Sequence, residues 1–166
     1  EQEKFRWLEF YKVKFKGSWY TRLFDKLVLR THTEFGFLGA FNNDRGVIPF
    51  DRFFLGGDGM SQYAMDGRET ISLRGYPNQS LSTQDGSTIY NRFSLELRYP
   101  ITLKPAASIF GLTFLETGQG YNSFREFNPF NGKRSLGLGL RIFMPAFGLL
   151  GIDFGYGLDA VNDFDL

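Results

Sequence analysis

Six stretches of the chain alternate between apolar and polar residues with a period of two, and this pattern limits the possible folds more than any other feature. In residues 27–41, Leu29 and Phe35 share one face of the expected strand, while Arg30 and Glu34 share the other. Such alternation predicts strands that are apolar on one side only. The six predicted strands cover residues 7–19, 27–41, 88–102, 107–121, 134–144 and 149–159. We expect Pro100 to end the third of them, because proline has no N–H to donate to a sheet.

The predicted strands are long, and the connections between them alternate in length. Strands in soluble proteins usually have about 5–6 residues, whereas a tilted strand that spans a bilayer needs roughly 9–11. Short connections lie near residues 23–26, 102–106 and 145–148, and longer ones cover residues 42–87 and 122–133. Membrane barrels have short turns at one end and long loops at the other. The pattern therefore favours a transmembrane β-barrel over a soluble sandwich or a lipocalin-like barrel.

Composition and charge agree with a barrel that has a hydrated interior. Aromatic residues make up 18% of the chain, yet the mean hydropathy is −0.24, and no apolar run is long enough for a transmembrane helix. The inner face of the predicted strands carries charges of both signs, which would be costly to bury in a ligand pocket. The formal net charge of +1 gives no reason to expect a nucleic-acid partner. The chain has no cysteine and one histidine, His32, so we expect no thiolate metal site, no histidine cluster, no cofactor and no enzymatic activity.

Several ordered motifs resemble those of one family. The long loop 42–87 contains RFFLGGDG (52–59) and SLRGYP (72–77), and NRFSLELRYPI (91–101) follows it. GLTFLETGQGY (111–121) and RSLGLGLRIFMPAFGLLGIDFGYGLD (134–159) come next. In this order the motifs resemble the BamA-type superfamily of outer-membrane protein insertases, over residues 7–159.

The resemblance implies an all-β fold, an antiparallel transmembrane β-barrel segment of about six strands. Residues 1–166 would form the C-terminal part of the barrel domain, corresponding to strands ten to fifteen of sixteen. The family's periplasmic POTRA repeats and its last strand would not be included. The loop 42–87, with its LRGY motif, would enter the barrel from the extracellular side.

The resemblance also assigns roles to residues of this loop. Arg74, Gly75 and Tyr76 would form a latch, with Glu96 and Glu116 on the following two strands as the lumenal partners of Arg74. A guanidinium is a planar fork of donors that two carboxylates can share. Gly75 would permit a tight reversal, and Tyr76 would pack against the barrel wall. We expect Gly137 and Gly139 to leave room beside the inserted loop.

The function implied by the resemblance is the folding and insertion of nascent outer-membrane proteins in a Gram-negative bacterium. The expected partners are unfolded outer-membrane protein clients, lipoproteins of the assembly machinery and the lipid bilayer. A polypeptide transporter of the two-partner-secretion type, from the same superfamily, is an alternative. A passive porin is a weaker one.

Overall fold

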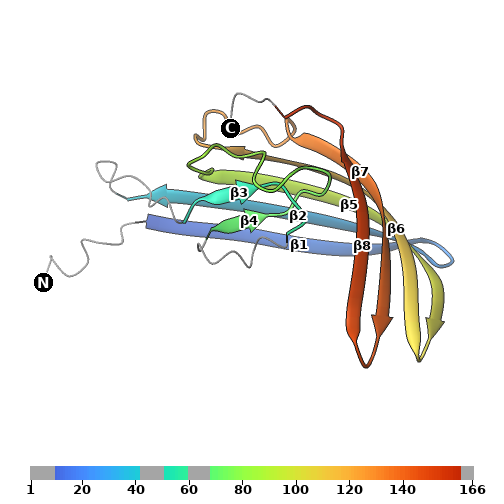
Figure 1. Cartoon of the computed structure of the whole chain (residues 1–166). Helices are drawn as coiled ribbons and strands as arrows, with labels where there is room; N and C mark the ends of the chain where they lie inside the picture. Colours follow the sequence, from blue (N-terminus) through green and yellow to red (C-terminus); the bar gives the residue numbers. More distant parts are fainter. Residues whose placement is uncertain (1–9, 42–50, 60–67, 162–166) are drawn as a thin grey trace, which may run out of the picture.

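A six-stranded antiparallel sheet dominates the computed structural model, which describes residues 10–41, 51–59 and 68–161 (Figure 1). Its strands lie in the order β1-β2-β5-β6-β7-β8. They are β1 (Phe10–Phe24), β2 (Leu27–Ala40), β5 (Ile89–Lys104), β6 (Ala107–Tyr121), β7 (Lys133–Met144) and β8 (Gly148–Gly157). The prediction of an all-β, antiparallel barrel segment with six long strands is confirmed. Within the described ranges, no helix is long and apolar enough to cross a membrane.

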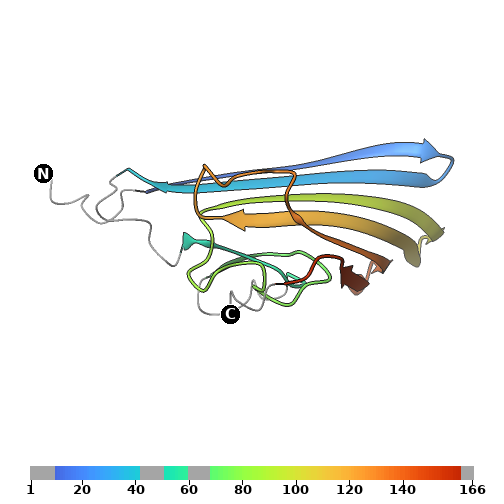
Figure 2. The ribbon, with the colours of Figure 1, turned by 90° about the horizontal axis from the view of Figure 1, so that it is seen from above.

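The sheet is curved and has two different faces. Figure 1 shows β7 and β8 running steeply across the direction of β1 and β2, as the accumulated twist of a barrel wall requires. Large apolar side chains of the outer face are exposed, among them Phe15, Leu97 and Leu138. The inner face carries the charged residues and is covered by the long loop between β2 and β5 (Figure 2).

The prediction that Pro100 ends its strand is wrong. β5 continues through Pro100 to Lys104, and the register of its pairing with β6 shifts between Pro100 and Thr102. A β-bulge adds a residue to one strand and interrupts the hydrogen-bond ladder locally. Proline, which lacks the donor, fits such an interruption without ending the strand.

The long loop contains regular structure that the sequence pattern did not reveal. β3 (Phe53–Leu55) and β4 (Glu69–Ile71) pair in parallel, and Phe53 also forms a bridge with Ser87. The parts of the predicted loop at 42–50 and 60–67 lie outside the described residues. All three residues of β3 are buried. The strand therefore shows no alternation of apolar and polar residues by which it could have been predicted.

An apolar cluster joins this loop to the sheet. It consists of Leu38, Phe53, Leu55, Ile71 and Tyr90, which come from the loop and from β2 and β5. The rings of Phe53 and Tyr90 meet edge to face, with centroids 4.6 Å apart. A Cβ atom on Gly36 would lie 2.1 Å from the Tyr90 ring. Glycine at this point of β2 therefore lets the loop and sheet approach each other.

Candidate functional site

Arg74 lies at the tip of a turn that main-chain hydrogen bonds hold in shape. The Gly56 N–H donates to the Ile71 carbonyl over 3.0 Å, and the Gly57 N–H donates to the Tyr76 carbonyl over 3.1 Å. Gly57 also forms a β-bridge with Leu73. Two parts of the loop that are distant in sequence thus fix the position from which the Arg74 side chain extends.

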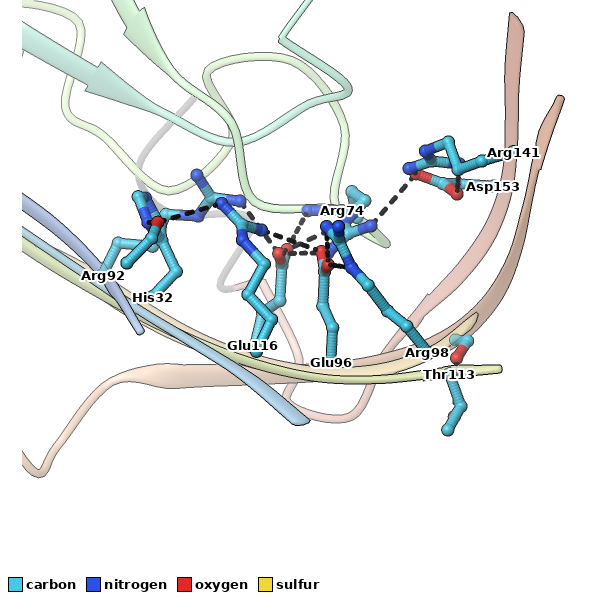
Figure 3. A network of polar contacts seen from close by, with 12 residues as sticks. His32, Arg74, Arg92, Glu96, Arg98, Thr113, Glu116, Arg141 and Asp153 are labelled. Atoms are coloured by element: carbon cyan, nitrogen blue, oxygen red, sulfur yellow. Dashed lines mark hydrogen bonds and ion pairs between the residues drawn. The ribbon is translucent and has the colours of Figure 1, made fainter. Parts of the chain in front are cut away.

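The strongest contact of Arg74 is with Glu116 on β6 (Figure 3). Its Nη2 and Nε donate to Glu116 Oε1 over 2.6 and 3.2 Å, and its main-chain N–H donates to Oε2 over 3.0 Å. Glu116 is fully buried, at 0% exposure. A buried carboxylate that accepts several charge-assisted bonds is held in one geometry, so Glu116 fixes both the side chain and the main chain of Arg74.

Arg74 also contacts Glu96 on β5 and Asp153 on β8. Nη2 donates to Glu96 Oε1 over 2.8 Å, and Nη1 donates to Asp153 Oδ2 over 3.1 Å. Burial would lower the pKa of Arg74, but the bonds to Glu116 and the charges of Glu116 and Glu96 outweigh it, and the pKa is raised. The guanidinium therefore stays charged at any physiological pH.

Each of these three carboxylates is also bound by an arginine of the sheet itself. Glu116 accepts from Arg92 Nη2 over 2.8 Å, and Glu96 accepts from Arg98 Nη2 over 2.5 Å. Asp153 accepts two bonds from Arg141, over 2.5 and 2.7 Å. The carboxylates would thus keep a positive partner if Arg74 moved away.

The strand register explains why small and flat side chains surround the guanidinium. Glu116 lies between Ser94 on β5 and Ser135 on β7. In the next row, Glu96 pairs with Phe114, whose ring centre lies 3.7 Å from Arg74 Cζ. An arginine stacked on an aromatic face gains a cation–π attraction. The row beneath Arg74 therefore offers a negative charge and an aromatic surface side by side.

Gly137 and Gly139 leave room for side chains that contact the loop. A Cβ on Gly137 would lie 2.4 Å from the Phe114 ring, and one on Gly139 would lie 2.2 Å from Asp153 Oδ1. The groups nearest to these glycines are thus two side chains that contact Arg74 and, at Gly137, also the Phe154 carbonyl of β8. The loop backbone passes over Gly155 of β8, where a Cβ would lie 2.7 Å from the Gly75 nitrogen.

Gly75 and Tyr76 attach the motif to the end of β8. Gly75 has φ +92°, and a Cβ there would lie 2.8 Å from the Tyr156 carbonyl carbon, so this position requires glycine. The buried Tyr76 hydroxyl donates to the Arg134 carbonyl over 2.7 Å and accepts from the Asp159 N–H over 3.2 Å. Tyr76 therefore links the start of β7 to the residues that follow β8.

A second ionic contact ties the loop to β1. Glu69 of β4 accepts from Lys12 over 2.9 Å and from Lys14 over 2.8 Å. Burial would raise the pKa of Glu69, but the hydrogen bonds from the two lysines lower it below its usual value. The loop is thus held at both sides of the apolar cluster.

The structure brings Arg74 together with both carboxylates named from the sequence, Glu96 and Glu116. Asp153 and Phe114 were missed as partners, although the alternation of residues 149–159 puts Asp153 on the polar face of its strand. Phe114 lies two residues from Glu116 and therefore on the same face of β6. This spacing was a sign that the inner face of β6 carries both apolar and charged side chains. Across residues 10–41, 51–59 and 68–161, no group of side chains could hold a metal ion. What the arrangement can do chemically is to hold the long loop against the inner face of the sheet.

Comparisons with known proteins give the family. Residues 4–166 match the model of the Omp85 superfamily domain. Among solved structures, the chain is similar to BamA from Haemophilus ducreyi lacking POTRA domains 1–3, with a TM-score of 0.72 and 20% sequence identity. That match covers 93% of this chain and 32% of the other, so the chain spans about a third of that protein's length. No curated protein matches the chain. The chain therefore belongs to the Omp85 superfamily, and it forms part of a β-barrel in the outer membrane of a Gram-negative bacterium.

Proposed function

We propose that this chain is the latch-bearing part of a β-barrel assembly factor that folds and inserts nascent outer-membrane proteins. The observation that carries the proposal is the binding of Arg74 to three carboxylates from three strands. No covalent chemistry is involved. The clients are unfolded outer-membrane proteins, and assembly lipoproteins and the bilayer are the other partners.

The latch would hold the loop inside the barrel while still permitting release. Because Glu116, Glu96 and Asp153 each keep an arginine of the sheet, removal of the loop leaves no isolated negative charge in the lumen. Leaving a buried charge without a partner is the largest cost of breaking such a contact. The site therefore suits a loop that moves during a working cycle better than a permanent structural tie.

A bacterial strain that can be depleted of its own copy of the protein tests the proposal. The complete protein with Arg74→Ala should support less assembly of other barrel proteins, measured as the fraction that migrates as the folded, heat-modifiable form. Arg68→Ala is the matched control, because Arg68 lies in the same loop and hydrogen-bonds to Gln79 within that loop. Normal barrel assembly in the Arg74→Ala strain would overturn the role of the latch.

The same strain separates assembly from secretion. Loss of the whole protein should lower the folded amounts of several unrelated barrel proteins. If their amounts stay normal while one secreted polypeptide is retained in the periplasm, the chain belongs to a transporter and not to an assembly factor.

A further inference from the structure

The connection between β6 and β7, residues 122–132, lies on the outer face of the sheet. In Figure 2 this orange segment and the green loop that carries Arg74 lie on opposite sides of the strands. Phe124 stacks on Phe37 with ring centroids 5.7 Å apart, and Phe127 meets Tyr121 edge to face at 5.4 Å. Residues 122–132 are called the outer flap below.

The outer flap covers the part of the outer face that lies nearest the long-loop end. Ile89 and Asn91 point to the same side as Phe93 and Leu95, yet they are only 1% and 0% exposed. The Asn91 amide donates to the Pro129 carbonyl over 3.0 Å. A polar side chain on a face turned toward lipid would otherwise lack a partner, so the flap supplies an acceptor for the Asn91 amide nitrogen where lipid could not.

Two phenylalanines of the flap are exposed, beside the exposed polar residues Arg125, Glu126 and Asn128. Phe130 is 94% exposed and Phe124 is 61% exposed. Between the flap and the strands lies a hollow of about 360 Å³, lined by Phe93, Leu95, Leu115, Pro129 and Phe130 together with Glu116, Thr117 and Arg134. This hollow is continuous with the exposed apolar side chains of β5 and β6, such as Leu97, which face the hydrocarbon of the membrane.

We propose that the outer flap sits in the outer leaflet of the membrane, with Phe124 and Phe130 among the lipids and an acyl chain in the hollow. Long loops of outer-membrane barrels are on the extracellular side, and the outer flap joins the same ends of the strands as the long loop does. Aromatic side chains are favoured at the boundary between headgroups and hydrocarbon. The flap thus extends the lipid-facing surface beyond the strands themselves. This inference does not depend on whether the protein assembles barrels or secretes polypeptides.

Spin labels on the complete protein in lipid nanodiscs test the proposal. The chain contains no cysteine, so Phe130→Cys and Phe124→Cys each introduce a labelling site in the flap. Gln84→Cys, at an exposed position of the loop on the inner side, is the matched control. Deuterium modulation of each nitroxide signal is recorded twice, with chain-deuterated lipid in ordinary water and with ordinary lipid in heavy water.

At positions 130 and 124, the modulation from deuterated acyl chains should exceed that from heavy water severalfold, and the order should reverse at position 84. A dominant heavy-water signal at both flap positions would show that the flap is bathed in water, and it would overturn the proposal. A weak signal from both sources would mean that protein covers the flap, which overturns it equally. Two exposed label positions keep the test valid if one variant fails to fold.

Discussion

Replacing Arg74 by alanine should weaken the docking of the loop without unfolding the sheet. Removing one partner of a buried ion pair costs about 3–5 kcal/mol when the other charge is left unpaired. The three carboxylates each keep an arginine of the sheet, so the loss here is that of charge-assisted hydrogen bonds, about 1.5–3 kcal/mol. Losing the contact with the Phe114 ring weakens docking of the loop by at most about 1 kcal/mol more. We expect the loop-opening free energy to fall by about 3 kcal/mol, or about 100-fold in the opening equilibrium.

Amide hydrogen exchange on the complete protein in nanodiscs measures this opening. The Gly56 and Gly57 amides report on it, because they donate to carbonyls in the same turn as Arg74. Their exchange should accelerate about 100-fold in Arg74→Ala. In Arg74→Lys the acceleration should be smaller, since an ammonium keeps the charge but loses the planar fork.

Two controls separate loop release from general loosening. Arg68→Ala should change exchange at Gly56 and Gly57 far less than Arg74→Ala does, since Arg68 is exposed and its contacts with Gln79 and the Phe54 ring are those of a surface charge, worth about 0.2–1 kcal/mol. Leu95, which pairs with Leu115 across β5 and β6, should keep its protection in every variant. If Arg74→Ala accelerates the Gly56 and Gly57 amides less than about threefold, Arg74 does not hold the loop, because that is under 1 kcal/mol.

Three further changes test other contacts of the loop. Gly75→Ala should weaken docking of the loop by more than the strain of about 1–2 kcal/mol expected for a left-handed residue. Gly148 has φ +86° and nothing within 4 Å of a new Cβ, so Gly148→Ala should cost only that strain. Equal effects of the two substitutions on heat-modifiability would argue against the close contact between Gly75 and β8. Tyr76→Phe should cost about 1 kcal/mol and speed exchange at the Asp159 amide, and an unchanged Asp159 amide would contradict the bond. The pKa of Glu69 is lowered from 4.5, so its contribution to docking is present above about pH 4.5 and is lost as the pH falls through the lower pKa of the folded state. The loop-opening free energy, measured by amide exchange and corrected for intrinsic exchange rates, should therefore decrease at low pH. Glu69→Gln should remove this pH dependence.

The strands were predictable because each has one apolar and one polar face. The exceptions have local physical causes. Pro100 has no N–H to donate to a β-ladder, but the bulge next to it interrupts the ladder, so no donor is needed there. β3 is buried on all sides and so carries no alternation.

The site was predictable only as far as a local motif or alternation could indicate it. Arg74 and its two glutamates followed from the resemblance. Asp153 could be placed on the inner face, but its distance from Arg74 depends on the register of β6, β7 and β8, which no local pattern encodes. Tyr76 binds main-chain atoms of Arg134 and Asp159, and such atoms are present at every position of a sequence.

A double-mutant cycle between Arg74→Ala and Glu116→Gln tests the central claim most directly. The loop-opening free energy is measured by exchange of the Gly57 amide in the four proteins. If Arg74 holds the loop through Glu116, the second change adds little once the first is made, and the coupling should be about 2 kcal/mol, within the usual range for residues in contact. Effects that simply add, with no coupling, would contradict the account.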